Sequence, residues 1–557
     1  PLRYFQRGRE RERKERYYIV YIYTHLSVSN KTRGTTSHIN LSSSSTHKQR
    51  RESCVNLTSS SCMGAMKTRS ASLGRWLNEV VSFVVFCLLD IVDSLLCLLY
   101  KTADYLLEAE WKPCYCLSPK ELITTTTKRN ILVSHNNGES KILTVSPLQQ
   151  LSGRSKIELE EISETLYSRP SLLSDLSKLS INDFTRWLVS VTGSNSKCGE
   201  TKTSKRKGRT LMSKFTVSFT VVEMLQGKIK PQNLSRQASR WSDCDCGFCT
   251  CWTSTCVKDQ SLFVKTQLPK AKGSITGRED VLFIHGFISS SAFWTETVFP
   301  SLLNSNYRLF AVDLLGFGKS PKPADSLYTM REHVEMIEKS VLLKHNVKSF
   351  HIVAHSLGCI LALGLVARHG GSIKSLTLLA PPYHPVPATE AEPRQYVMRK
   401  VAPRRVWPPI AFGASMACWY EHISRTICLL ICKNHRLWQF LAKLITRNNR
   451  TINFLIEGFM CHTHNAAWHT LHNIICGIGS KLDLYLDIVR DKMKCNVFIF
   501  HGRDDEVVPV ECSYNVQSRI PRARVKVVEN KDHITLVVGR QDEFARELEE
   551  IWKSSSC

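Results

Sequence analysis

Ser356 lies at the centre of the pentapeptide Ala-His-Ser-Leu-Gly, the segment of this chain whose residue types most clearly suggest chemistry. The residues two positions before and after it, Ala354 and Gly358, are small, as a sharp turn with a strained central residue requires. An apolar, β-branched run, residues 349–353, precedes the pentapeptide, and a run with helical apolar spacing follows it. Strand, tight turn and helix together predict a nucleophile elbow that presents the Ser356 hydroxyl.

A serine hydroxyl is a poor nucleophile at neutral pH, so catalysis needs a base that takes its proton and returns it to the leaving group. The predicted base is His533, which follows the strand-like run 523–529. The predicted acid is Asp505, whose carboxylate would orient the imidazole and stabilise the imidazolium. The order serine, acid, histidine along the chain is that of α/β-hydrolases and differs from the chymotrypsin and subtilisin orders.

Two adjacent aspartates compete for the role of the acid. In the pattern G-x-x-D-x-x-V-P, which runs from Gly502 to Pro509, Asp505 occupies the fourth position. Asp504 is then expected to cap or solvate the turn.

A serine mechanism also needs hydrogen-bond donors for the oxyanion of the tetrahedral intermediate, and a single donor contributes roughly 2.7–4 kcal/mol. We assign this role to two backbone N–H groups. One belongs to Leu357, directly after the nucleophile, and the other to Phe287, directly after a His-Gly pair that ends the apolar run from Val281.

Each of these chemical segments follows a short apolar run typical of a buried parallel strand. The predicted fold class is therefore α/β. It is an α/β-hydrolase fold, a doubly wound, mostly parallel sheet with a helical lid inserted before the acid-bearing strand. An N-terminal hydrophobic helix and a disordered N-terminal extension precede this fold.

The lid is predicted because 115 residues separate the strand that ends at Ala380 from the strand that begins at Asn496, far more than the core fold needs. Its aromatic residues could form the lid's own core or line an apolar acyl cavity. Four histidines have spacings that a metal site could use, but we interpret them as a polar lid surface or substrate contacts: His462, His464, His469 and His472.

The chain has 557 residues, which suits one catalytic domain with appendages. The predicted organisation is 1–62, an extension that is disordered or non-native; 63–117, a membrane-targeting signal or anchor helix; 118–257, a region with a cysteine cluster; 258–380 and 496–557, the two parts of the hydrolase core; and 381–495, the lid.

The formal net charge is +26, which favours contact with anionic surfaces such as phospholipid head groups or acidic polysaccharide. Nucleic acid is not an expected partner, because no recognised binding motif accompanies the charge. Residues 1–62 carry 12 Lys and Arg against 4 Asp and Glu, are rich in serine and threonine, and contain no methionine before Met63. This composition predicts disorder.

An apolar run from Trp76 to Leu107 contains polar residues at spacings near three and four, which places them on one face of a helix. Three interpretations compete. A signal peptide or anchor fits the basic residues that precede the run. An amphipathic helix in the membrane interface accommodates the aspartates better. A helix packed on the catalytic domain is the third. We favour membrane targeting by the secretory route, with anchoring or secretion left open.

The chain has 21 cysteines, and five of them fall within residues 244–256. Cys246 and Cys249 form a C-x2-C pair, but no second pair follows at the spacing of a zinc ribbon. Disulfides in an oxidising compartment are therefore the favoured interpretation of the cluster. We expect no metal and no organic cofactor.

Several longer segments resemble the plant BODYGUARD group of α/β-hydrolases. They include EWKPCYC, RWSDCDCGFC, DLLGFGKSPKPADSLYT, VWPPIAFGASMACWYEHISRT and EGFMCHTHNAAWHTLHNII, and the resemblance runs from about Leu73 to Trp552. It implies an extracellular or membrane-associated esterase, of a group described as probable lysophospholipases and linked to cuticle formation. It also implies Ser356 as nucleophile and His533 as base.

The predicted function is therefore a serine esterase that acts on a long-chain acyl ester, such as a lysophospholipid, an acylglycerol or a cutin monomer. The expected partners are this lipid substrate and a membrane surface or cell wall. Two alternatives remain open. One is a transacylase that assembles hydroxy-acyl polyester, and the other is a non-catalytic receptor on the same fold.

Overall fold

The computed structural model describes the part of the chain that carries the predicted hydrolase domain and most of the apolar N-terminal run. The described residues are 57–108, 126–127, 130–134, 140–144, 163–166, 240–246, 249, 261–269, 279–303, 305–323, 326–446, 450–493 and 496–555. The predicted disordered extension, residues 1–62, lies almost wholly outside them, as does most of the region 118–257.

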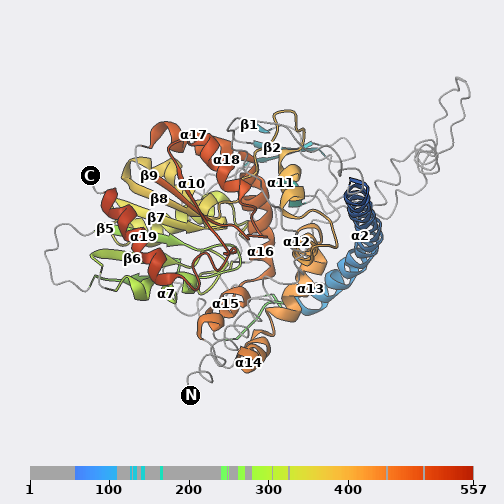
Figure 1. The fold of residues 1–557 in the computed structure, drawn as a ribbon. Helices are drawn as coiled ribbons and strands as arrows, with labels where there is room; N and C mark the ends of the chain where they lie inside the picture. Colours follow the sequence, from blue (N-terminus) through green and yellow to red (C-terminus); the bar gives the residue numbers. More distant parts are fainter. Residues whose placement is uncertain are drawn as a thin grey trace, which may run out of the picture.

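A seven-stranded sheet forms the centre of the molecule, in the order β10-β9-β8-β7-β5-β6-β4 (Figure 1). Every neighbouring pair is parallel except β4 with β6, which is antiparallel and leaves β4 at one edge. The strands are β4 Val264–Gln267, β5 Glu279–Ile284, β6 Tyr307–Val312, β7 Phe350–His355, β8 Ile373–Leu379, β9 Asn496–Gly502 and β10 Arg524–Val528. The prediction of a mostly parallel, doubly wound sheet is confirmed.

Helices cover both faces of this sheet. One layer contains α9 Met330–Ile337, η5 Glu338–Leu343, α10 Leu357–His369, η6 Gly370–Ser372, α17 Leu482–Lys492 and α18 Glu511–Arg519. The other contains α7 Ala292–Thr295, α8 Val298–Ser301 and α19 Gln541–Ser554. Because α17 packs against α10, the last helix of the predicted lid segment belongs to the sheet-covering layer.

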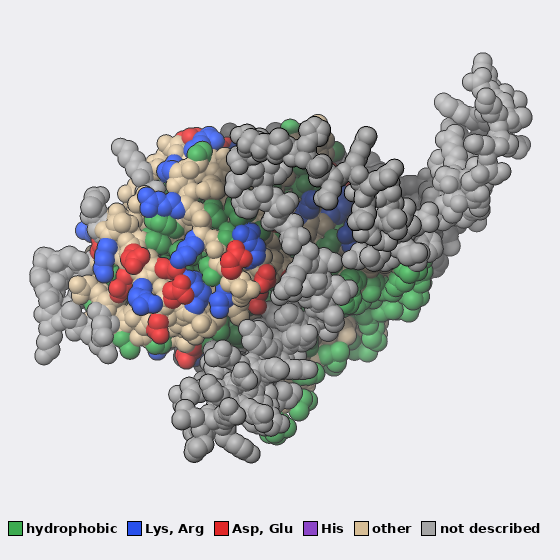
Figure 2. Space-filling model, in the orientation of Figure 1, with side chains coloured by type: hydrophobic (Ala, Val, Ile, Leu, Met, Phe, Trp, Pro, Cys, Tyr) green, Lys and Arg blue, Asp and Glu red, His purple; other side chains and the backbone are tan. Residues whose placement is uncertain are grey.

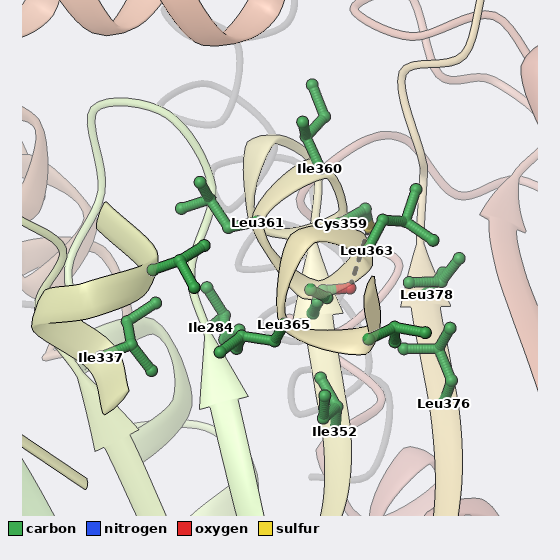
Figure 3. Packing of buried hydrophobic residues seen from close by; sticks show 14 of the residues in the cluster. Ile284, Ile337, Ile352, Cys359, Ile360, Leu361, Leu363, Leu365, Leu376 and Leu378 are labelled. Carbon is green, nitrogen blue, oxygen red and sulfur yellow. Dashed lines mark hydrogen bonds between the residues drawn. The ribbon is translucent and has the colours of Figure 1, made fainter. Parts of the chain in front are cut away.

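Side chains of β5 alternate between the two helical layers, as the period of a strand requires. Leu282 and Ile284 join the core beneath α10, whereas Val281 and Phe283 join the core beneath α19. Figure 3 shows the first of these cores, in which leucine and isoleucine side chains of α10 lie against β5, β7 and β8. This packing on both sides explains why the strands that precede the chemical residues are almost wholly apolar.

The lid is a group of helices between β8 and α17. Its elements are α11 Pro393–Val401, α12 Pro409–Trp419, α13 Glu421–Ile431, α14 His435–Thr446, α15 Arg450–Met460, α16 His464–Thr470, η7 Leu471–Ile478 and η8 Gly479–Lys481. Smaller described elements are the antiparallel strands β1 Thr126–Thr127, β2 Asn130–Ser134 and β3 Ser140–Thr144, and the turn η4 Glu164–Leu166.

The four lid histidines are buried, so their interpretation as a polar lid surface is wrong: His462, His464, His469 and His472. Each has a polar partner inside the lid or at its base. His469 Nδ1 lies 2.8 Å from the Asn465 carbonyl, and His472 Nδ1 lies 2.9 Å from Thr165 Oγ1. Such hydrogen bonds offset the cost of burying a polar ring.

The apolar N-terminal run forms one helix, α2, Leu57–Glu108. Its polar stripe faces the lid, with Ser82, Asp93, Lys101 and Asp104 all buried. The Asp93 carboxylate accepts hydrogen bonds of 2.9 and 3.0 Å from the His422 and Ile423 N–H groups in the first turn of α13. Among the described residues α2 is the one helix long and apolar enough to cross a membrane.

The opposite face of α2 exposes large apolar side chains, among them Leu88, Leu95 and Leu98. In Figure 2 this face is a green band along the α2 side of the molecule, whereas blue and red side chains are spread over the sheet domain. The packed side of the helix therefore combines this polar stripe with apolar residues such as Phe86, while a second, larger apolar face points outward.

Candidate active site

Ser356 occupies the sharp turn between β7 and α10, with φ 53° and ψ −120°. A positive φ is costly for a residue with a side chain, and it is found where the surrounding structure enforces it. The enforcing contact is Gly358, because a Cβ atom at this position would lie 2.7 Å from the backbone oxygens of both Ile284 and His285. The small residue expected after the serine is thus required by the close approach of α10 to β5.

His533 and Asp505 form a hydrogen-bonded pair, with 2.7 Å between His533 Nδ1 and Asp505 Oδ2. Because Nδ1 donates to the carboxylate, Nε2 is left as the basic nitrogen of the ring. The pair stands at the carboxyl edge of the sheet, since Asp505 follows β9 and His533 follows β10. The register aligns this edge with the end of β7, where His355 is opposite Leu379 of β8 and Leu379 is opposite Phe500 of β9.

The Asp505 carboxylate is held by three further groups. Its Oδ1 accepts hydrogen bonds from the N–H groups of Val507 at 2.9 Å and Val508 at 2.8 Å, and His501 Nε2 lies 3.4 Å from Oδ2. His501 is in turn fixed by Ser513 Oγ, 2.6 Å from its Nδ1. Although burial opposes ionisation, the adjacent His533 imidazole and these hydrogen bonds hold the pKa of Asp505 well below its usual range.

Asp504 is placed differently from its neighbour. Its side chain is exposed, and its backbone N–H donates a 2.9 Å hydrogen bond to the Lys531 carbonyl. Asp505, by contrast, is buried and contacts the histidine. Of the two aspartates that compete in the sequence, Asp505 is therefore the one beside His533.

The loop after β5 approaches Ser356 closely. A Cβ atom on Gly286 would lie 3.1 Å from Ser356 Cβ, so the backbone next to Phe287 runs directly past Ser356. His285 shapes this loop: its Nε2 accepts the Leu314 N–H at 3.0 Å, and its Nδ1–H donates to the Gly286 carbonyl at 2.7 Å. Burial lowers the pKa of His285, which keeps the ring neutral in this double role.

Leu357, the other predicted oxyanion residue, is the first residue of α10 and is buried. The N–H groups of the first turn of a helix have no partner within that helix. Leu357 and Phe287 thus belong to two segments that flank Ser356, one after it in the chain and one across from it.

His355 is a residue of the site that the sequence-based reasoning missed. Its Nε2–H donates a 2.9 Å hydrogen bond to the His533 carbonyl, and its ring stacks on Phe293 with 4.9 Å between centroids. Burial lowers the pKa of His355 to about 3, and the nearby His533 imidazole adds to this effect. The neutral ring therefore ties the end of β7 to the loop that carries His533. Its position directly before Ser356 was the one available signal.

The lid contacts the same edge of the sheet. Phe317 forms an isolated antiparallel bridge with His462, and the Phe317 ring packs edge-on against Phe287 with 5.9 Å between centroids. Within the described part of the chain, the groups of side chains that could hold a metal ion lie outside the site around Ser356, in the lid and in the segment 244–249.

Comparison with known proteins places this arrangement in a family. A family model described as alpha/beta hydrolase fold matches residues 281–539. "Probable lysophospholipase BODYGUARD 3" of Arabidopsis thaliana is 76% identical over 502 residues, which cover 89% of this chain and 100% of that protein. "Probable lysophospholipase BODYGUARD 1" of the same plant is 55% identical over 490 residues, 86% of this chain and 97% of that protein.

Proposed function

This chain belongs to the BODYGUARD family of α/β-hydrolases and is a carboxylic ester hydrolase, and from that premise we propose that Ser356, His533 and Asp505 form its catalytic triad. The observation that carries the proposal is the combination of a strained serine turn, φ 53°, with a buried histidine–aspartate pair at 2.7 Å on the same edge of the sheet. Geometry and chemical type, rather than position in the chain, define such a triad.

The proposed reaction is acyl transfer in two steps. Ser356 Oγ attacks the ester carbonyl while its proton passes to His533 Nε2, and the alkoxide of the leaving group takes that proton as the ester bond breaks. Water then attacks the acyl-enzyme, gives a proton to the same nitrogen, and releases the fatty acid with a free Ser356 hydroxyl. The negative charge of each tetrahedral intermediate would be stabilised by the N–H groups of Leu357 and Phe287.

A fluorophosphonate probe tests the nucleophile, because it reacts with an activated serine and stays covalently bound. The unsubstituted protein is expected to be labelled, and Ser356→Ala is expected to abolish labelling. Ser518→Ala, which removes an exposed serine on α18, is the matched control and should be labelled normally. Labelling that survives Ser356→Ala would show that another residue is the nucleophile.

The proposed substrate is a long-chain acyl ester, with a lysophospholipid as the first choice. Two relatives bear the name probable lysophospholipase, which supports this class for a chain that matches nearly their whole length. Acylglycerols and cutin-type monomers carry the same ester bond and belong to the same test. A panel of the three esters, assayed with Ser356→Ala as blank, would rank them, and a chain that cleaves only short water-soluble esters would contradict the proposal.

The role in cuticle formation that the family resemblance implies is also a proposal. It would require the enzyme to reach the secretory route and the cell surface. The same acyl-enzyme could be resolved by a hydroxyl-bearing acceptor instead of water, which would extend a polyester. Product analysis with ω-hydroxy acyl esters separates the two, since hydrolysis gives free acid and transfer gives dimers.

We further propose that α2 holds the enzyme at a membrane surface by lying in the interface. Its contacts with the lid extend from Asn78, 3.3 Å from the Trp407 carbonyl, to Asp104, which pairs with Arg425 at 2.7 Å. A span would need about 20 residues free of protein contacts. No such stretch exists between these two contacts, whereas an interfacial helix needs only one apolar face.

Vesicle flotation of the full chain tests this attachment. The unsubstituted protein should float with phosphatidylcholine and phosphatidylglycerol vesicles, and Leu95→Glu with Leu98→Glu should reduce the floating fraction. Leu343→Glu, which changes an equally exposed leucine on the sheet domain, is the matched control. Equal flotation of both variants would contradict a role for α2.

A further inference from the structure

A group of three thiols and one imidazole lies where the segment 240–249 meets the lid. The ligand atoms of Cys244, Cys246, Cys249 and His435 all lie within 4.8 Å of one another. The sulfur atoms of Cys244 and Cys249 are 3.2 and 3.8 Å from His435 Nδ1, and that of Cys246 is 3.3 Å from Nε2. We propose that these four residues bind one structural Zn²⁺ ion.

The spacing of these atoms fits a tetrahedral zinc site. With Zn–S of about 2.3 Å and Zn–N of about 2.0–2.1 Å, the ligand atoms of a tetrahedron stand about 3.5–3.8 Å apart. The sulfur–nitrogen distances of this group, 3.2 to 3.8 Å, are close to that range. Three thiolates and one imidazole form a donor set that zinc favours, whereas magnesium and calcium prefer oxygen ligands.

The surroundings of the group also suit a metal site. The Cys249 N–H points at the Cys246 sulfur at 3.4 Å, a hydrogen bond that stabilises a thiolate. His435 Nδ1 also lies 3.2 Å from the Cys432 carbonyl, to which Nδ1–H can donate; binding of the ion through Nε2 then requires the ring to turn so that Nε2 faces all three sulfurs, since Cys244 and Cys249 now lie nearest Nδ1. A metal-bound histidine commonly donates its other N–H in this way. Cys249 and His435 are both buried, which shields the centre from water.

A second group adjoins the first and supports the same chemistry independently. The His462 Nδ1–H donates to the Phe459 carbonyl at 2.7 Å, so the lone pair of Nε2 faces two thiols and can bind a metal ion. These are Cys428 at 3.7 Å and Cys432 at 3.5 Å, one turn apart on α13. The ligand atoms of these three residues lie within 4.8 Å of one another, and the fourth position of a tetrahedral ion here would be taken by water. We assign a second Zn²⁺ to this group.

Disulfides were the favoured interpretation of the cysteine cluster in the sequence. The structure forms none among the described cysteines, which include all five thiols of the two groups. Cys428 and Cys432 lie one turn apart on a single helix. Metal binding, unlike a disulfide, uses all three sulfurs of the first group together with the histidine.

The zinc centre would fix a junction of three elements. Its ligands come from the segment 240–249 and the start of α14. Trp241, in the same segment, donates a hydrogen bond from Nε1 to Asp104 of α2 at 2.6 Å. Arg425 of α13 binds the same carboxylate and Ser242 Oγ. One ion would thereby tie the lid to the segment that anchors the end of α2.

Metal analysis of the purified full chain tests the proposal directly. The protein, prepared in detergent without chelator and with a thiol reductant, is expected to contain about two zinc ions per chain by mass spectrometry. Replacement of zinc by Co²⁺ should give the intense visible bands of a tetrahedral site and a thiolate charge-transfer band in the near ultraviolet. Neither measurement requires activity, so both are independent of the esterase proposal.

Ligand variants separate the two groups. Cys244→Ser with Cys246→Ser should lower the zinc content by about one ion per chain, and Cys428→Ser with Cys432→Ser by about one as well. His435→Cys, which keeps four ligands, should retain the metal and shift the cobalt spectrum. Cys87→Ser removes a thiol of α2 outside both groups and is the matched control.

The proposal is overturned if the unsubstituted chain binds less than about half a zinc ion and gives no tetrahedral cobalt spectrum. Peptide mapping that finds Cys244, Cys246 or Cys249 in disulfides would overturn it too. These readouts come from the unsubstituted protein, so they decide the matter even if the double variants fail to fold.

Discussion

At the scale of single residues, the geometry around Ser356 depends on two close backbone approaches. At Gly358 an added Cβ atom would lie 2.7 Å from two backbone oxygens at the end of β5, so only glycine lets α10 begin this close to the strand. Gly286 lets the loop after β5 pass close to Ser356. The contact at Gly358 cannot relax easily, because its neighbours are backbone atoms at the end of a central strand, whereas the nearest neighbours of Gly286 are side-chain atoms of His355 and Ser356. The serine turn is therefore held by steric contacts, and its hydroxyl position is sensitive to them.

The first prediction concerns Gly358→Ala. The added methyl group must push α10 away from β5, and a displacement of about 1 Å at a reacting group can cost about 10²-fold in rate. We expect kcat on a p-nitrophenyl acyl ester to fall on that scale. Gly371→Ala, where a Cβ atom would meet nothing within 4 Å, is the control and should keep full activity. Equal rates for the two variants would show that the turn is not sterically fixed.

The second prediction separates the two adjacent aspartates. Asp505→Asn should lower kcat by about 10⁴-fold, the scale seen when the acid of a triad is neutralised, because the imidazole is then held in the wrong tautomer. Asp504→Asn should change kcat little, since that side chain is exposed. Both rates can be measured on the same ester. A larger loss in Asp504→Asn would reassign the acid.

At the scale of elements, α2 is joined to the lid by a buried ion pair. Asp104 accepts two hydrogen bonds of 2.7 Å from Arg425, and both side chains are almost inaccessible to water. Although burial opposes ionisation, the guanidinium holds the pKa of Asp104 below its usual value. The docking of an apolar helix by its polar face thus depends on charges whose partners lie far away in the chain.

The third prediction follows from this pair. Asp104→Ala leaves the Arg425 charge buried without its partner, which typically costs roughly 3–5 kcal/mol. We expect a large drop in the unfolding midpoint of the full chain in detergent. The double variant Asp104→Ala with Arg425→Met removes both charges and should recover part of the loss. If the double variant is less stable than the single one, the pair is not the contact that holds α2.

At the scale of the whole molecule, the pH dependence of stability is set in part by histidines that are buried in the neutral form. Burial lowers the pKa of His333 and His355 to about 3 and that of His351 to about 4, and the partial burial of His384 lowers its pKa to about 4 as well. In the unfolded chain a histidine titrates near 6.5. The unfolded state therefore binds more protons below that pH, and folding stability is lost as the pH falls from about 6.5 toward 4.

The fourth prediction puts a scale on this loss. At about pH 5 each such histidine should destabilise the folded state by about 2 kcal/mol relative to pH 7. Urea unfolding of the full chain at both pH values measures the change. His333→Asn, which removes one buried imidazole outside the proposed triad, should make the loss smaller by about one histidine's share. A stability that is equal at the two pH values would contradict the assignment of these rings as neutral.

The sequence alone determined the parts of this protein that depend on neighbours in the chain. Apolar runs predicted the strands β5, β7 and β9, because a strand buried on both faces contains few polar residues, and the strand-like run 523–529 predicted the edge strand β10. Small residues two positions from Ser356 predicted the sharp turn, because steric exclusion in a turn acts over only a few residues. The polar stripe of α2 was visible as a helical period.

Only the tertiary structure decided what those patterns contact. The fourth ligand of the proposed zinc site, His435, lies 186 residues after Cys249, so a search for a second nearby cysteine pair could not find it. The lid histidines were predicted to be surface residues because the residues next to a histidine in the sequence do not show whether it is buried. Packing between the lid helices buries them. The polar stripe of α2 likewise showed in the sequence which face of the helix is polar, but not that this face packs against the lid. Steric limits in turns and the periodicity of helices and strands depend on short segments of the sequence, whereas contacts between distant segments exist only once the whole chain has folded.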